Sequence, residues 1–353
     1  MNLSGNTSAT KSSNELLYVG FNQDSSCFAC GVTDGFAVFN VSPFGETFRR
    51  IFVSGGIGIV EMLFRCNLLA IVGGGRNPRY PPNKVMIWDD RQNRCVGELL
   101  FKTEVYAVRL RRDRVVVVLA NKVHVHRFKD LKLLQLITTV DNTLGLVAQS
   151  SSAAHNVLAV LGLVPGSVRV ELFDLAKFVV INAHQAELAA MALTADGTQL
   201  ATASSKGTII RVWDTITGIM LRELRRGTDR AEIYSLAFNP AATYLACSSD
   251  KGTIHVFSNV NANGISAASQ TTVSPMKTNT PTATRTRTES NNTNANNVFT
   301  QFATEQGGDH ILTSGPGTGA SSTPHANEKG SLAYLQNILP NGTVSKYFSS
   351  GKF

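Results

Sequence analysis

Long hydrophobic runs are missing from this sequence of 353 residues. No apolar stretch approaches the roughly 18–20 residues that a membrane-spanning helix requires. The opening segment, residues 1–14, is polar and rich in Ser, Asn and Thr, without the charged-then-apolar pattern of a signal peptide. We therefore expect a cytoplasmic protein with a disordered N-terminus, whose contact with any membrane is peripheral.

Cysteine is also scarce, with five residues scattered along the chain. Cys27 and Cys30 form a C-x-x-C pair, but no second pair stands at the spacing of a zinc site. They are better interpreted as small strand residues in a reducing compartment. The sequence also lacks a Gly-rich phosphate loop, a metal triad and a nucleophile motif. We accordingly expect no metal, no cofactor and no enzymatic activity.

Acidic residues are outnumbered, because 33 Lys and Arg face 25 Asp and Glu, a net charge of +8. Such a charge favours anionic partners, among them nucleic acid, phospholipid headgroups and acidic proteins.

A repeated β-rich unit is what the sequence does contain. Short apolar runs each close on an aromatic residue, and successive aromatics are 40 to 49 residues apart: Phe39, Trp88, Phe128, Phe173, Trp213 and Phe257. This period is typical of WD-repeat propeller blades, in which four-stranded sheets stack radially to share a core. Residues 15–257 are therefore predicted to form an all-β propeller, with essentially no helical periodicity before residue 330.

Two of these units align closely. Residues 200–208 match residues 245–253 at an offset of 45, and in each an alternating strand runs into a Lys-Gly turn. This pattern predicts two equivalent hairpins in neighbouring blades.

Composition changes after Phe257. Residues 258–330 are dominated by Asn, Thr, Ser, Gly and Ala, which cannot bury enough surface to fold, so disorder is expected. Residues 331–353 are predicted to contain an amphipathic segment, either packed on the propeller or lying in a lipid interface. Its apolar and aromatic residues are Leu332, Leu335, Ile338, Leu339, Tyr347 and Phe348.

Two adjacent arginines, Arg225 and Arg226, lie between the two matching units. Adjacent side chains of an extended chain point to opposite sides, so each arginine can serve a different pocket. The planar guanidinium donates two parallel hydrogen bonds to a phosphate.

Both flanking blades carry matching polar sets that could complete such pockets. The earlier set is Ser204, Lys206, Thr208 and Arg211, and the later set is Ser249, Lys251, Thr253 and His255. For one blade alone, these residues would be read as turn formers and surface cations. Their duplication around two arginines favours binding of two phosphate groups.

The motif Leu224–Gly227 resembles the Phe/Leu-Arg-Arg-Gly hallmark of the PROPPINs, a family of autophagy-related propellers. Residues 80–90 and 229–238 also look like family segments, and the Leu variant suggests one subgroup. The resemblance implies a seven-bladed propeller that binds phosphatidylinositol 3-phosphate and phosphatidylinositol 3,5-bisphosphate. It adds His184 to the first pocket and Arg230 to the second.

The same resemblance implies partners and a location. The protein would be a monomer that is recruited from the cytoplasm to preautophagosomal, endosomal or vacuolar membranes. It would act there as an effector and scaffold in autophagosome formation. Residues 331–353 would belong to the membrane-inserting loop of the sixth blade. The loop at Asn22 and Asp24 resembles a docking surface, and the autophagic lipid-transfer rod protein is the expected partner.

The sequence departs from the family because only six closing aromatics are found, so the propeller is expected to be truncated within its sixth blade. An unclosed propeller would leave apolar surface uncovered. Two alternatives to lipid binding stay open. One is a WD-repeat scaffold that binds only proteins, having lost lipid binding through truncation. The other, disfavoured for want of base-stacking aromatics, is nucleic-acid binding through the arginines between Arg109 and Arg114.

Overall fold

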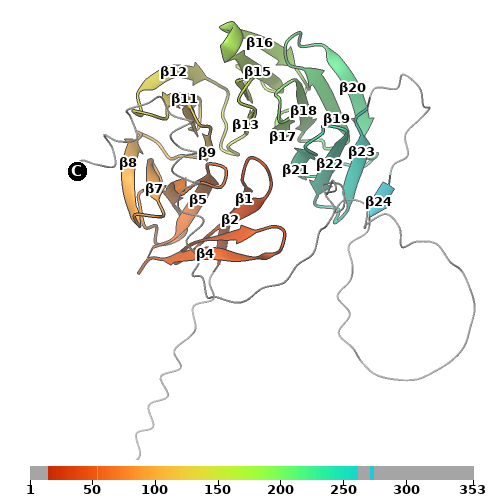
Figure 1. Cartoon of the computed structure of the whole chain (residues 1–353). Coiled ribbons are helices and arrows are strands. Elements are labelled where there is room, and N and C mark those ends of the chain that lie inside the picture. The colour runs from red at the N-terminus through yellow and green to blue at the C-terminus, as the bar shows by residue number, and fades with distance from the viewer. Residues whose placement is uncertain (1–14, 54, 261–270, 274–353) are drawn as a thin grey trace, which may run out of the picture. The chain divides into compact units, whose positions relative to one another are not determined.

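Figure 1 shows a computed structural model of the chain, which describes residues 15–53, 55–260 and 271–273. Within these ranges, 24 strands form six antiparallel sheets of four strands each, all in one compact unit. The first strands of successive sheets contact one another and lie innermost in Figure 1. The chain is thus an all-β propeller of six described blades, as the repeats predicted.

The strands of the first three blades follow the chain order. Blade 1 contains β1 (Leu16–Phe21), β2 (Cys27–Val32), β3 (Gly35–Asn40) and β4 (Gly45–Ile51). Blade 2 contains β5 (Ile57–Met62), β6 (Leu68–Gly73), β7 (Lys84–Asp89) and β8 (Arg94–Leu100). Blade 3 contains β9 (Ala107–Leu110), β10 (Arg114–Val118), β11 (Lys122–Arg127) and β12 (Leu133–Thr138).

The other three blades repeat this plan. Blade 4 contains β13 (Val147–Gln149), β14 (Val157–Leu161), β15 (Ser167–Leu172) and β16 (Lys177–Asn182). Blade 5 contains β17 (Leu188–Leu193), β18 (Gln199–Ser204), β19 (Ile209–Asp214) and β20 (Met220–Arg225). Blade 6 contains β21 (Ile233–Phe238), β22 (Tyr244–Ser249), β23 (Ile254–Ser258) and β24 (Thr271–Val273).

The core of the described part lies between the blades. Its buried hydrophobic residues form five clusters, one at each junction of successive blades. Because every strand alternates its side chains between two faces, one strand contributes to two clusters. In β18, for example, Leu200 packs toward blade 4, while Ala201 and Ala203 pack toward blade 6. Blade stacking therefore stabilises the fold, and no blade buries both faces alone.

The closing aromatics hold equivalent positions in the blades. Each lies in the third strand of its sheet or directly after it, as Trp88 does in β7 and Phe173 after β15. The one helical element in the described ranges is a single 3₁₀ turn, η1 (Phe173–Leu175). Both observations agree with a β-repeat period without helical periodicity.

Blade 6 extends beyond the boundary drawn from the sequence. Its fourth strand, β24, pairs with β23 and lies in the stretch expected to be unstructured. Nothing in the sequence indicated this strand, because large apolar residues are few after Phe257. A short edge strand needs few of them, since backbone hydrogen bonds to the neighbouring strand hold it.

One face of blade 1 carries an exposed aromatic row. Phe28 lies opposite Phe21 and Phe39 in the sheet, and its ring stacks on Phe39 with centroids 5.1 Å apart. Phe44 continues this row and is 75% exposed. The opposite face of the same sheet packs on blade 2. Blade 1 thus carries exposed apolar surface on the face that does not pack on blade 2.

Candidate functional site

Arg225 ends the outer strand of blade 5, and Arg226 is the first residue after that strand. Across β19 and β20, Arg225 lies opposite Ile209 and Glu223 lies opposite Arg211. Directly opposed residues share a face, and residues two apart on one strand do so too. Arg225 therefore stands on the face of Arg211, which looks toward blade 4.

Arg226 is turned the other way and is buried, with 6% of its surface exposed. Its Nε donates to the Gly207 carbonyl at 2.5 Å, and a terminal nitrogen donates to the Asp229 carbonyl at 2.5 Å. Gly207 has a φ of +66°, and a Cβ there would lie 1.9 Å from the Ala231 carbonyl oxygen. This turn therefore requires glycine, and it fixes the position of the guanidinium between blades 5 and 6.

Blade 6 carries hydroxyl groups and an imidazole on the face that packs on blade 5, toward which Arg226 is turned. His255 lies opposite Cys247, and its Nε2 is 3.2 Å from the Thr253 hydroxyl. Burial and then the neighbouring Arg226 charge lower the pKa of His255. Burial raises the pKa of Cys247 to about 11, although the Arg226 charge opposes this rise. Cys247 packs in the cluster between blades 5 and 6, so His255, directly opposite it, stands on the blade 6 face that looks toward blade 5.

Ser249 adds an unsatisfied group to this cluster. Its side chain is buried, and its hydroxyl has no hydrogen-bond partner among the described residues. A buried hydroxyl without a partner costs free energy, and a ligand oxygen would remove that cost.

The two remaining cations expected on this side are more exposed. Lys251 pairs with Asp250 at 3.1 Å, and the same carboxylate feels the charge of Arg226. Arg230 is exposed in the loop before β21. The structure thus brings Arg226, Ser249, Thr253 and His255 together, with Lys251 at the edge. We name these five residues and Arg230 the blade 6 cluster.

The blade 5 cluster consists of Arg225, Ser204, Lys206, Thr208, Arg211 and His184. Arg211 donates to the Glu223 carboxylate at 2.9 Å and to the Ala183 carbonyl at 2.7 Å. Ser204 is buried and Thr208 is half-buried, whereas Lys206 is exposed in the turn between β18 and β19. Because Glu223 neutralises part of the Arg211 charge, this cluster is less positive than its sequence indicates.

His184 takes part in a structural hydrogen-bond network. Its Nε2 is 3.0 Å from the Thr202 hydroxyl, which also accepts the Trp213 indole N–H at 2.9 Å. Burial lowers the pKa of His184 to about 4, outweighing the hydrogen bond to Thr202, and the Arg211 charge lowers it further. His184 is therefore neutral at neutral pH and contributes no positive charge.

Sequence reasoning missed Thr202 and Glu223. Both lie directly opposite Arg211, one on each neighbouring strand. The strand register could have identified both, but the pairing of Arg211 with Glu223 depends on a bulge at Val212 and Trp213, which the sequence does not reveal.

The two residues expected to dock a partner differ in exposure. Asn22 is 4% exposed, and its side chain makes hydrogen bonds within the loop between β1 and β2. It accepts a hydrogen bond from the Cys27 N–H and donates one to the Ser26 hydroxyl. Asp24 is exposed and accepts two hydrogen bonds from Ser26, which help to lower its pKa. Of the two, Asp24 is therefore the one whose side chain is exposed at the surface. The expected membrane-inserting residues Leu332, Leu335, Ile338, Leu339, Tyr347 and Phe348 lie outside the described residues.

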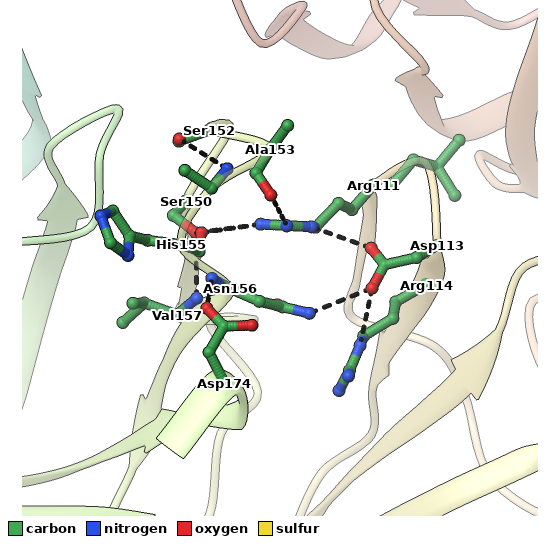
Figure 2. Close-up of polar contacts among 12 residues, drawn as sticks. Arg111, Asp113, Arg114, Ser150, Ser152, Ala153, His155, Asn156, Val157 and Asp174 are labelled. Carbon is green, nitrogen blue, oxygen red and sulfur yellow. Dashed lines mark hydrogen bonds and ion pairs between the residues drawn. The ribbon is translucent and has the colours of Figure 1, made fainter. Parts of the chain in front are cut away.

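The arginines between Arg109 and Arg114 make internal contacts. Figure 2 shows Arg111 joining blade 3 to the loop between β13 and β14. It donates to Asp113 at 2.8 Å and to the His155 carbonyl at 2.9 Å, while Arg114 also pairs with Asp113. Arg109 pairs with Glu61 at 3.4 Å. Arg109 and Arg111 therefore link blade 3 to the blades on either side of it. This internal role removes the main support for nucleic-acid binding.

Residues 15–53, 55–260 and 271–273 contain no cluster of three or more His, Cys, Asp or Glu side chains that could hold a metal ion. The same residues contain no helix with the length and apolar character of a membrane span.

Comparisons with known proteins give the family. The PROPPIN family model matches residues 15–284. The chain is 44% identical to Autophagy-related protein 18e of Arabidopsis thaliana over 70% of this chain and 67% of the relative. It is 42% identical to SVP1-like protein 2 of Neurospora crassa, over 69% of this chain and 56% of that relative. The chain thus spans roughly half to two thirds of the length of the curated relatives.

Solved structures agree with this result. Kluyveromyces lactis Hsv2 aligns with a TM-score of 0.63 at 27% identity, over 70% of this chain and 74% of that one. A complex of KlAtg21 with the coiled-coil of AgAtg16 aligns with a TM-score of 0.62 at 28% identity, over 69% and 81%. On the family match and the curated relatives together, this chain belongs to the PROPPIN family.

Proposed function

We propose that this protein is a phosphoinositide-binding propeller of autophagy that acts by binding and not by catalysis. The observation that carries the proposal is the opposite orientation of Arg225 and Arg226, each facing its own set of hydroxyl and cationic groups. Membership of the PROPPIN family and similarity to autophagy-related proteins support it.

The blade 6 cluster is the better-formed of the two proposed phosphate sites. Arg226 supplies a fixed guanidinium, while Ser249 and Thr253 supply hydroxyl donors. Two donors on Arg226 are used by backbone carbonyls, so its remaining N–H groups and the nearby hydroxyls would bind phosphate oxygens. Lys251 and Arg230 would add positive charge at the entrance.

The blade 5 cluster would bind the second headgroup. Arg225 and Lys206 would make its main charged contacts, and Ser204, Thr208 and Arg211 would complete it. His184 would hold Thr202 and Trp213 in place and would contact a phosphate only as a neutral donor or acceptor. The ligands proposed for the two sites are phosphatidylinositol 3-phosphate and phosphatidylinositol 3,5-bisphosphate.

Two weak sites on one rigid body would act together on a membrane. Linked binding sites gain about 10²–10⁴ in overall affinity when both can engage at once. Residues 331–353, proposed to insert into the lipid interface, would add a third contact. A monomer would thus pass from the cytoplasm to preautophagosomal, endosomal or vacuolar membranes that carry both lipid and partner.

We also propose a scaffold role in autophagosome formation, with the autophagic lipid-transfer rod protein as a partner. The Leu224 variant of the Arg-Arg motif supports assignment to the subgroup that pairs with this protein. Asp24, exposed at the turn between β1 and β2, is the proposed contact residue. The KlAtg21 neighbour, solved with a coiled-coil bound, supports a scaffold role for this fold.

Liposome flotation tests the proposal. The native protein should float with liposomes that contain either phosphoinositide and should not float with phosphatidylcholine alone. Arg225→Thr/Arg226→Thr should abolish flotation, and each single variant should weaken it at least tenfold. Arg91→Thr/Arg94→Thr, which removes the same charge from exposed positions in blade 2, should float normally.

Two results would overturn this assignment. Normal flotation of the Arg225→Thr/Arg226→Thr protein would show that lipid is bound elsewhere. If the native protein does not float with any phosphoinositide liposome, the chain is a propeller that binds proteins only.

A further inference from the structure

A hollow of about 290 Å³ lies where blade 4 meets blades 3 and 5, and neither Arg225 nor Arg226 lines it. Three connections line it, namely those from β12 to β13, from β14 to β15 and from β16 to β17. The first and the third can be located by their strand labels in Figure 1. Its apolar lining includes Leu146 and the buried side chains of Leu161 and Leu188. The volume is at the lower end of the range for small-molecule pockets, which suits one or two inserted side chains.

Large apolar residues extend the hollow onto the surface. Leu144 at its edge is 71% exposed. Leu163 is 69% exposed and Val164 is also exposed, both in the turn whose Pro165 and Gly166 line the hollow. Exposed apolar residues grouped beside a hollow indicate an interaction surface, whereas scattered ones do not.

Hydrogen bonds hold the walls of the groove, by which we mean the hollow together with the exposed Leu144, Leu163 and Val164 beside it. The Asn142 side chain bridges its own loop, donating to the Leu146 carbonyl at 3.0 Å and accepting the Leu146 N–H at 2.8 Å. In the opposite turn, the Ser167 hydroxyl donates to the Val164 carbonyl at 2.6 Å. The Val140 N–H donates to the Gly162 carbonyl and joins the two walls. A groove formed in advance loses little entropy when it is occupied.

The rim of the groove is acidic. Asp141 and Glu187 both line the hollow and are both exposed. Among the described residues neither takes part in an ion pair, whereas many other carboxylates of the chain do. In a protein of net charge +8, two such carboxylates beside an apolar hollow define the charge of the occupant.

We propose that this groove docks a peptide segment of a partner protein, in which a bulky apolar side chain is flanked by Lys or Arg. The apolar side chain would enter the hollow over Leu161 and Leu188, and the cations would pair with Asp141 and Glu187. An anionic lipid surface does not fit, because the two carboxylates repel phosphate. A small ligand would leave Leu144 and Leu163 uncovered.

The groove is physically continuous with the blade 5 cluster. The Gly166 carbonyl accepts the N–H groups of Ala183 and His184, each at 3.0 Å, and His184 in turn contacts Thr202. A docked peptide would therefore lie beside that cluster without using its arginines. The proposal does not rest on phosphoinositide binding.

A displayed library of random peptides provides the test. The library is selected on the native full-length chain and counter-selected on Asp141→Lys/Glu187→Lys. The expected result is an enriched motif that combines a large apolar residue with Lys or Arg. A labelled peptide with that motif should bind the native chain, and it should bind at least tenfold more weakly to the charge-reversed variant and to Leu144→Ser/Leu163→Ser.

Matched controls separate docking from folding and from lipid binding. Glu15→Lys/Glu104→Lys makes the same change in charge at exposed positions far along the chain and should keep native peptide affinity. Asp141→Lys/Glu187→Lys, Leu144→Ser/Leu163→Ser and Glu15→Lys/Glu104→Lys should keep the native melting curve by circular dichroism, because the side chains that they replace are exposed. Arg225→Thr/Arg226→Thr should bind the peptide normally.

Several results would overturn the proposal. They are the failure of any peptide to be enriched, a motif without basic residues, and equal binding to the charge-reversed variant. Loss of flotation by Leu144→Ser/Leu163→Ser would instead make the groove a lipid contact. A dimer in sedimentation that Asp141→Lys/Glu187→Lys abolishes would make it a contact between two copies of this chain.

Discussion

Arg225 and Arg226 are neighbours in the chain, yet they stand on opposite faces of blade 5. Arg225 shares its face with Arg211 and Glu223, whereas the Arg226 guanidinium is buried toward blade 6. There, burial and then the Arg226 charge lower the pKa of His255. The two residues therefore differ in burial and in surroundings, which gives each of them a separate consequence when it is replaced.

Replacing Arg226 should cost stability as well as ligand binding. In Arg226→Ala, the Gly207 and Asp229 carbonyls lose their charged donor in a largely buried site, and we expect about 2 kcal/mol of lost unfolding free energy. Arg225→Ala, at an exposed strand end, should lose less than about 1 kcal/mol. Urea denaturation followed by circular dichroism gives both values. Equal losses would contradict the assigned burial.

The pH dependence of lipid binding should depend on His255. Burial and the Arg226 charge hold its pKa below the usual value, so the free protein carries a neutral imidazole at neutral pH. A bound phosphate favours the charged imidazolium, so liposome affinity should rise as the pH falls from neutral into the acidic range.

Flotation between pH 5 and 7.5 measures this effect. His255→Gln should remove the rise, while His184→Gln should leave it unchanged, because the pKa of His184 is already about 4. A rise that persists in His255→Gln would show that another group titrates.

Glu61 should make stability depend on pH. Burial raises its pKa to about 7, and the nearby Arg109 charge only partly opposes this shift. Since the folded pKa exceeds the unfolded value, the stabilising contribution is complete below about pH 4.5 and is lost as the pH rises toward 7.

Glu61→Gln lacks this titration. The stability of the variant relative to the native chain should therefore increase between pH 4.5 and 7, by at most about 3 kcal/mol, and should stay constant above that range. Thermal or urea unfolding at several pH values gives this difference directly. A difference that does not change with pH would refute the raised pKa.

The hydrogen bonds of Arg111 should hold the loop between β13 and β14 in place. Arg111→Met removes the donor to the Ser150 hydroxyl and to the Ala153 and His155 carbonyls, and it leaves Asp113 with fewer partners. We expect a loss of about 2 kcal/mol and faster amide hydrogen exchange in residues 150–157.

Arg127→Met is the matched control, because Arg127 is exposed and makes one ion pair with Asp130. It should leave both stability and exchange near native values. Unchanged exchange in Arg111→Met would mean that the backbone alone holds this loop.

Much of the site was predictable from local sequence. The turn after Ser204 and the matching turn after Ser249 both place a Lys beside a required glycine, and this repetition located the two clusters. The strand period of two also predicted that Arg225 and Arg226 would diverge. What could not be predicted were the Glu223 carboxylate at Arg211 and the neutral state of His184. Both depend on the packing of strands that are separated along the chain.

The sequence by itself determined the repeat, the strands and the position of the paired arginines. The reason is that strand alternation and the spacing of the closing aromatics depend only on the order of residues along the chain. Only the tertiary structure decided which cations are buried among the atoms of a neighbouring blade and which stay exposed. Arg111 and Arg225 are the same residue type in similar strand-end settings, but the neighbouring blade surrounds the first with carbonyls and leaves the second exposed. Burial and the distances between blades set the charge of a site, and neither is fixed until the blades pack together.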